Sequence, residues 1–275
     1  MYFRDPSEQF PYLATDEVDN VDASADSPPW LYQDTADTTS TGPDWDLSTC
    51  CDKYESIFIS LVPVYLVVIA VLWNTVFLKP MKLIAVFVHE LSHAIACWMT
   101  GGTVKEINVN TDEGGVTKFV GGCRIIIIPA GYLGGAFWGG VLVAMSGNRW
   151  AAFSISIAFC VAMLASLILK PNCAMIVTNL FFVALTVAFI VADRVLDMFL
   201  VNYLTLYYGV FIGAFSIYDI YDDLLTRTVE GSDAHACFKL IPCCLPRCVG
   251  LQFAVVALAF QAAGVYFGLL WMTSN

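Results

Sequence analysis

Long runs of apolar residues, separated by polar segments most of which contain proline or glycine, extend from about residue 57 to the end of the chain. Each run approaches the length of about 20 residues that an α-helix needs to cross the hydrocarbon core of a bilayer. The predicted spans are residues 57–78, 81–100, 125–145, 150–169, 174–191, 196–218 and 249–272. The pattern predicts an all-α polytopic membrane protein with about seven transmembrane helices.

The segment between the second and third runs has a different period. Val104, Ile107 and Val109 alternate with polar residues, Gly114-Gly115 follows, and apolar residues then return. This pattern is typical of two short strands joined by a turn, so a β-hairpin is predicted over residues 103–122, at the membrane surface. The hairpin could offer an edge strand to an extended substrate, or it could be a connecting loop.

The N-terminal segment is polar and has neither a helical nor a strand period. It mixes Asp, Ser, Thr and Pro with scattered aromatic residues, a composition that cannot bury a core. Residues 1–55 are therefore predicted to be a disordered acidic tail, and residues 56–275 a transmembrane domain.

Composition and charge support this division. Hydrophobic residues make up 58% of the chain and charged residues only 13%, which exceeds the apolar share of soluble domains. The net charge is −11, but 13 of the 24 acidic residues lie in residues 1–55, and the rest of the chain is balanced. Without a basic patch the chain is not expected to bind nucleic acid. Its expected partners are membrane lipid, embedded proteins or proteins that bind the tail.

The charged residues of the loops predict an orientation. With seven crossings, nine Lys and Arg residues fall on the side of the tail and the hairpin, and four fall on the opposite side. Because short cytoplasmic loops carry an excess of Lys and Arg, the N-terminal tail is expected in the cytosol. The organelle is not indicated.

The second apolar run contains the motif His-Glu-x-x-His as His89, Glu90 and His93. Residues at positions i and i+4 of a helix lie on one face, so the two imidazoles can bind one tetrahedral zinc ion while Glu90 polarises its water. A buried polar cluster that packs one helix against others would use the same residues. It is the weaker explanation, because two imidazoles and a carboxylate are unfavourable in hydrocarbon without metal or water.

A catalytic zinc ion usually has a third protein ligand. Asp219 is the first candidate, because the second and sixth predicted helices run in the same direction and both Asp219 and the motif lie toward the same ends. Asp222 and Asp223, about one turn further on, are alternatives, and the three could also be a water-exposed acidic cluster. Asp197 lies about 33 Å from Asp219 along the helix, too far to share its metal.

Four motifs resemble the site-2-protease-like intramembrane zinc metallopeptidases, in particular the peptidase M50B-like branch. They are HELSHA (His89–Ala94), EGGVT (Glu113–Thr117), PAGYLGGAFWG (Pro129–Gly139) and SIYDIYDDLLTRTVEGSDA (Ser216–Ala234). The resemblance covers roughly residues 81–270. It implies a membrane-embedded zinc site with His89 and His93 as ligands, Glu90 as base and an aspartate of a later helix as third ligand.

The sequence departs from that family at the third ligand. Better-studied site-2 proteases have the aspartate in an Asp-Gly pair, whereas Asp219 is followed by Ile220. The leading hypothesis is a zinc metalloendopeptidase that cleaves single-span membrane proteins. The alternatives are a non-catalytic membrane scaffold, with or without a structural metal, and a small transporter in which the acidic residues relay protons.

Cysteines beside the last predicted span have two possible interpretations. Cys243, Cys244 and Cys248 adjoin Arg247, a setting that is compatible with palmitoylation, although plain thiols near a membrane are the favoured interpretation.

Overall fold

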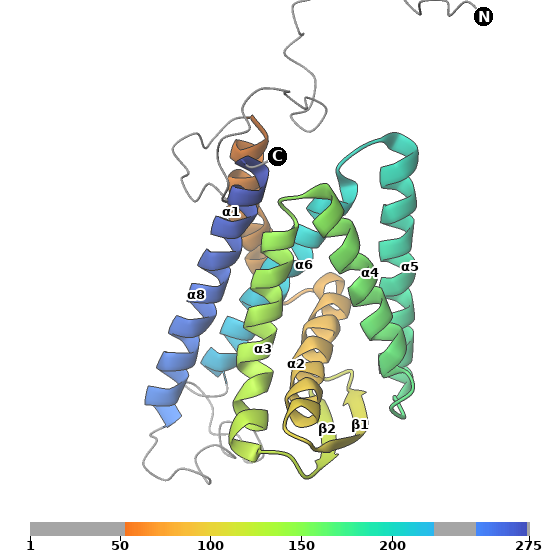
Figure 1. Ribbon diagram of the computed structural model, residues 1–275, viewed down its shortest axis with the longest axis vertical. Coiled ribbons are helices and arrows are strands. Elements are labelled where there is room, and N and C mark those ends of the chain that lie inside the picture. Colours follow the sequence, from red (N-terminus) through yellow and green to blue (C-terminus); the bar gives the residue numbers. More distant parts are fainter. Residues whose placement is uncertain (1–52, 223–245, 274–275) are drawn as a thin grey trace, which may run out of the picture. The chain divides into compact units, whose positions relative to one another are not determined.

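The computed structural model describes residues 53–222 and 246–273. Its elements, in chain order, are α1 (Lys53–Leu72), a short 3₁₀ helix η3 (Val76–Leu78), α2 (Lys79–Met99), β1 (Thr103–Val109), β2 (Gly115–Val120), α3 (Arg124–Met145), α4 (Arg149–Ser166), α5 (Cys173–Leu196), α6 (Leu200–Ile220) and α8 (Pro246–Thr273) (Figure 1). Residues 1–52 of the predicted acidic tail, Asp223 and the side chains of the three juxtamembrane cysteines lie outside the described residues, whereas residues 53–55, assigned to the tail, begin α1.

Seven helices in these ranges are long and apolar enough to cross a membrane. They comprise α1, α2 together with η3, α3, α4, α5, α6 and the part of α8 from Val249 to Met272. The predicted fold is confirmed: the protein is a multi-pass integral membrane protein, mostly helical, with one two-stranded hairpin after the motif helix.

The boundary between the first two spans differs from the prediction. The first helix was expected to continue to Leu78 and to end at Lys79-Pro80, but α1 ends at Leu72, and Lys79-Pro80 begins α2. Proline has no backbone N–H to donate and a fixed φ angle, and both properties suit the first turn of a helix. Pro80 therefore starts a helix here and does not terminate one.

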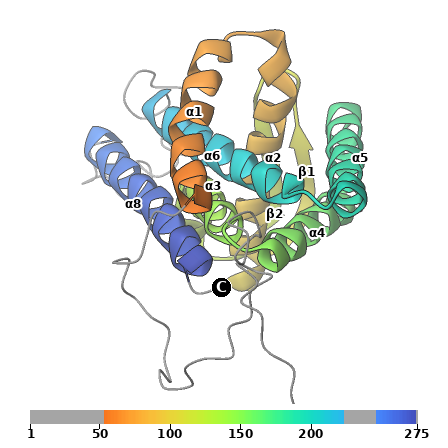
Figure 2. The same cartoon turned by 90° about the horizontal axis from the view of Figure 1, so that it is seen from above.

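Helix α3 holds the bundle together by packing on α6, α8 and α2, and Figure 2 shows α6 passing between α3 and α1. Close approach is possible because both contact faces carry glycine. A Cβ atom at Gly139 would lie 2.7 Å from the backbone nitrogen of Gly213 and 3.0 Å from the backbone oxygen of Gly209, both on α6. Gly139, the last of the glycines that repeat every four residues in α3, therefore brings the backbones of α3 and α6 into contact.

The hairpin doubles back along α2, and its two strands pair antiparallel. The apolar residues of β1 face inward: Val104, Ile107 and Val109 are all buried. The turn was predicted at Gly114-Gly115, but it spans residues 110–114, and Gly115 is already the first residue of β2. Glu113, with a φ of 69°, supplies the left-handed residue in that turn.

A charged cluster joins α4, α5 and α6 near the start of α6, at the opposite end of that helix from Asp219. Arg149 at the start of α4 donates to Asp193 at 3.1 Å and to Asp197 at 3.0 Å. The other carboxylate oxygen of Asp193 accepts from the backbone N–H of Val201 at 3.1 Å. These two acidic residues therefore link the ends of three helices.

Candidate metal centre

The two motif histidines lie on one face of α2, as their spacing predicts. The ring centroids of His89 and His93 are 4.9 Å apart, and the rings meet edge to face. Across from them α3 presents Gly131. A Cβ atom at that position would lie 2.3 Å from Nε2 of His89 and 2.5 Å from Nε2 of His93. Both Nε2 atoms therefore approach one point beside the backbone of α3.

His93 is oriented by a backbone carbonyl of α3. Its Nδ1 atom lies 2.7 Å from the backbone oxygen of Ile127, and His93 is buried. Because a carbonyl oxygen can only accept, Nδ1 of His93 donates this hydrogen bond. Nε2 then carries the lone pair that a metal ion requires, an arrangement that is usual for metal-binding histidines.

Asp219 approaches the pair from the last turn of α6. Its Oδ2 atom lies 3.3 Å from Nδ1 of His89, with the two side chains 27% and 15% exposed. The prediction that α6 brings Asp219 to the depth of the motif agrees with this contact. Asp222 lies just beyond the end of α6, and Asp223 is outside the described residues.

The arrangement fits a metal held by imidazole nitrogen, with a carboxylate beside it. Two Nε2 atoms face a common point, one imidazole has its tautomer fixed, and the other contacts a carboxylate. In the part of the chain that the structure describes, however, no three His, Cys, Asp or Glu side chains form a group that could hold a metal ion.

Glu90 faces the hairpin, not α3. Its side chain is buried, and Oε2 accepts a hydrogen bond of 2.6 Å from the hydroxyl of Thr117 in β2. The same hydroxyl lies 3.0 Å from the backbone oxygen of Glu90. Gly115, two residues earlier in β2, leaves the space that the carboxylate occupies: a Cβ atom there would lie 2.3 Å from Oε1.

Three residues of this site were not among the candidates from the sequence. Tyr132 of α3 is buried and packs its ring edge to face against His89, with 5.1 Å between centroids. From the sequence, Gly131 and Thr117 were noted only as members of the motifs PAGYLGGAFWG and EGGVT. The EGGVT motif itself was the signal that could have suggested Thr117, because it places a hydroxyl residue beside a turn that follows the motif helix.

A family model described as Peptidase M50B-like matches residues 62–264 of the chain. The chain belongs to the Peptidase M50B-like family. This confirms the predicted resemblance, and the matched segment includes both histidines, Glu90, Thr117, Gly131 and Asp219. No curated protein and no solved structure matches the chain.

Membership of the Peptidase M50B-like family agrees with the architecture. The matched segment contains most of the seven helices that are long and apolar enough to cross a membrane, among them α2, α3 and α6, which contact one another around His89, His93 and Asp219. The family assignment and the seven apolar helices together identify a peptidase-type integral membrane protein.

Proposed function

We propose that the protein is an intramembrane zinc metalloendopeptidase that cleaves membrane-spanning substrates. The observation that carries the proposal is the approach of both histidine Nε2 atoms to one point on α3, while Glu90, the residue next to His89, has its carboxylate directed to the hairpin. Together with the family assignment, this arrangement supports a hydrolytic metal site better than it supports a structural polar cluster.

Three side chains would hold the metal ion. His89 and His93 would bind it through Nε2. Asp219 is the proposed third ligand; in the structure it contacts Nδ1, the other nitrogen of the His89 ring, so its carboxylate would have to turn toward the ion to bind it. When bound, zinc lowers the pKa of a coordinated water and polarises the carbonyl group of the scissile peptide. Tyr132 keeps the ring of His89 in place by packing against it.

Glu90 is the general base of the proposed mechanism. Its carboxylate accepts a proton from the attacking water and then delivers it to the amine of the leaving strand. The buried position of Glu90 limits access of bulk water, so the proton stays near the reacting groups.

The expected substrate is a single-span membrane protein in an extended conformation. Helical backbone is already hydrogen-bonded, so a segment must unwind before its carbonyl groups can react. The outer edge of β1 is used by the α4–α5 connection, where Ile107 N–H donates to Leu169 and Asn172 donates to Val109. The edge of β2 is therefore the position at which we propose that substrate adds a strand.

Metal content and cleavage test this function together. Full-length protein purified in detergent should contain about one zinc ion per chain, and the combined variant His89→Ala, His93→Ala should contain none. A single-span peptide labelled with a fluorophore and a quencher serves as the probe. Glu90→Gln should retain zinc and lose cleavage, since it removes the base and not a ligand.

Two results would contradict the proposal. Zinc far below one per chain that is unaffected by the histidine substitutions would exclude both a catalytic and a structural zinc site at this position. The second result has two parts: Glu90→Gln retains zinc, and the same variant rescues every defect of a null allele. Together these would identify a non-catalytic scaffold.

A further inference from the structure

We propose that the hairpin positions the general base: Thr117 is a positioning residue for Glu90, and Gly115 provides the space that this position requires. The inference rests on the proposed function, because Glu90 acts as a base only if the protein is a peptidase. It assigns to the EGGVT segment a role in the reaction that differs from substrate docking.

The hydrogen bond from Thr117 has the length of a charge-assisted bond. At 2.6 Å the hydroxyl is as close to Oε2 of Glu90 as hydroxyl donors come to ionised carboxylates, and it is 3.0 Å from the backbone oxygen. The carboxylate is thus the main acceptor. Threonine also suits this role because its branched Cβ restricts χ1, so the hydroxyl is held in one direction.

Gly115 restricts the other half of the carboxylate. A Cβ atom at this position would lie 2.3 Å from Oε1, 2.6 Å from Cγ and 2.7 Å from Cδ of Glu90. The carboxylate therefore rests against the backbone of β2. With Oε2 bound by Thr117 and Oε1 against Gly115, the carboxylate plane has little freedom to rotate.

Strand geometry explains why these two residues act together. Side chains at positions i and i+2 of a strand point to the same face, so Gly115 and Thr117 both face α2. Val116, between them, is exposed. A shift of the hairpin register by one residue would turn Thr117 away from Glu90, so the contact depends on a fixed register.

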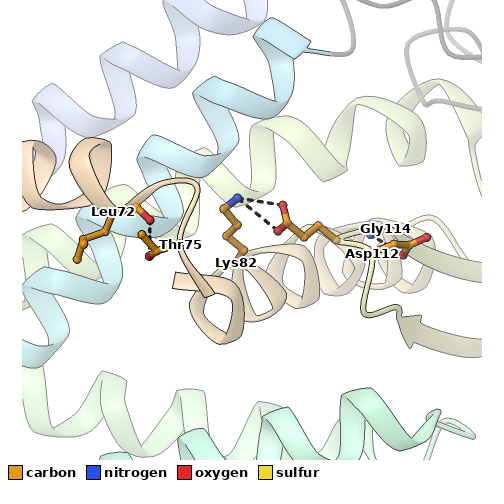
Figure 3. Close-up of polar contacts among 6 residues, drawn as sticks. Leu72, Thr75, Lys82, Asp112 and Gly114 are labelled. Carbon is orange, nitrogen blue, oxygen red and sulfur yellow. Dashed lines mark hydrogen bonds and ion pairs between the residues drawn. The ribbon is translucent and has the colours of Figure 1, made fainter. Parts of the chain in front are cut away.

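An ion pair at the turn holds that register. Lys82, buried in the first turns of α2, lies 3.1 Å and 3.3 Å from the two carboxylate oxygens of Glu113. Figure 3 shows Lys82 extending toward the turn that contains Asp112 and Gly114. The ammonium group also lies 4.7 Å from the ring centroid of Trp73. Lys82 and Glu90 are about 12 Å apart along α2, so the hairpin is attached at two separate points.

Cleavage kinetics give the first test, with the labelled single-span peptide as the probe. Thr117→Val keeps the shape and removes the hydroxyl, and it should lower kcat by about 10- to 100-fold, as expected for a residue that orients a reacting group, with KM and zinc content unchanged. Thr117→Ser restores the hydroxyl and should recover most of kcat. Thr111→Val, in the exposed part of the turn, is the matched control.

The result that would overturn the inference is a Thr117→Val enzyme with the kcat of the wild type, or a loss that Thr117→Ser fails to recover. A wild-type protein that binds zinc and cleaves only when Glu90 is intact establishes the proposed function independently. Failure of the inference is then a separate outcome from failure of the function.

Thermal unfolding gives the second test and needs no substrate. Glu90→Leu removes the carboxylate, so Thr117→Val should lower the Tm of the wild type and should lower the Tm of Glu90→Leu by a smaller amount. Equal shifts in the two backgrounds would show that Thr117 does not hold the carboxylate and would overturn the inference. If the wild type neither binds zinc nor cleaves, the proposed function is wrong and the catalytic role of Thr117 is wrong with it. Unequal Tm shifts in the two backgrounds would then still establish the contact between Thr117 and Glu90.

Discussion

Replacing Gly131 by alanine adds one methyl group at the point that both histidines face. The new Cβ would lie 2.3 Å and 2.5 Å from their Nε2 atoms, whereas ordinary contacts begin at 3.4 Å. Each ring would therefore have to move by about 1 Å, several times the tolerance of about 0.2 Å that metal–ligand distances allow.

Neither side of this contact can move away freely. His93 is held by its hydrogen bond to Ile127. Helix α3 is in backbone contact with two other helices: a Cβ atom at Gly140 would lie 2.5 Å from the backbone oxygen of Phe260 in α8, and one at Gly139 would lie 2.7 Å from the backbone nitrogen of Gly213 in α6. The strain therefore falls on the imidazoles, and zinc affinity should fall by more than the factor of about 100 that marks the loss of an outer partner.

The assay is zinc retention in competition with a chelator, using the full chain in detergent. Gly134→Ala is the matched control, because its Cβ would lie 2.4 Å from Ser92, which is on α2 like the two histidines, without touching either histidine. Both variants should unfold at lower temperature than the wild type, but only Gly131→Ala should lose zinc. Wild-type zinc affinity in Gly131→Ala, or an equal loss in both variants, would refute the reasoning.

Three further predictions concern the surroundings of the site. Asp219→Asn should weaken zinc binding in the same competition assay and Asp197→Asn should not, since Asp219 lies in the last turn of α6 beside His89, whereas Asp197 caps α5 before α6 begins and pairs with Arg149. A loss above about 100-fold would identify Asp219 as a ligand, a loss of about 10- to 100-fold would identify a partner that orients His89, and equal effects of the two substitutions would contradict the assignment. Lys82→Met should lower the free energy of unfolding by about 1–2 kcal/mol and speed limited proteolysis of the hairpin turn, because it removes the partly buried, charged hydrogen bond to Glu113. Unchanged proteolysis would show that the Lys82–Glu113 ion pair is not needed to hold the turn. The hydrogen bond from Lys118 holds the pKa of Glu106 below its ordinary value, so the stability that this ion pair adds is complete above the ordinary pKa and is lost as the pH falls through the lowered pKa. The difference in Tm between wild type and Glu106→Gln should therefore shrink on acidification, and a constant difference would exclude this linkage.

Much of the architecture could be predicted because it follows from local patterns. Apolar runs of bilayer length gave the spans, and the alternation around Ile107 gave the hairpin. The break after Leu72 was missed because only Asn74 and Thr75 interrupt an apolar run that continues to Leu78, and two polar residues in such a run do not by themselves mark the end of a helix. Pro80 was a second signal, but it is compatible with either side of a helix boundary.

In the candidate site, too, some residues follow from a local sequence pattern and others do not. His89, Glu90 and His93 could be predicted because their spacing alone places them within one helical turn. Thr117 and Gly131 could not, since their roles depend on the register of the hairpin and on where α3 crosses α2. Both are long-range properties that one sequence does not encode as a local pattern.

The contact between His89 and Asp219 joins two parts of the chain that are synthesised at different times. The motif helix, the hairpin and the first turns of α3 follow one another directly, whereas Asp219 is added only at the end of α6. At ordinary rates of translation the delay is on the order of 10 s. A nascent chain therefore enters the bilayer with both histidines and Glu90 but without Asp219, and the proposed enzyme cannot be active on neighbouring membrane proteins at its own site of insertion until six helices have been made.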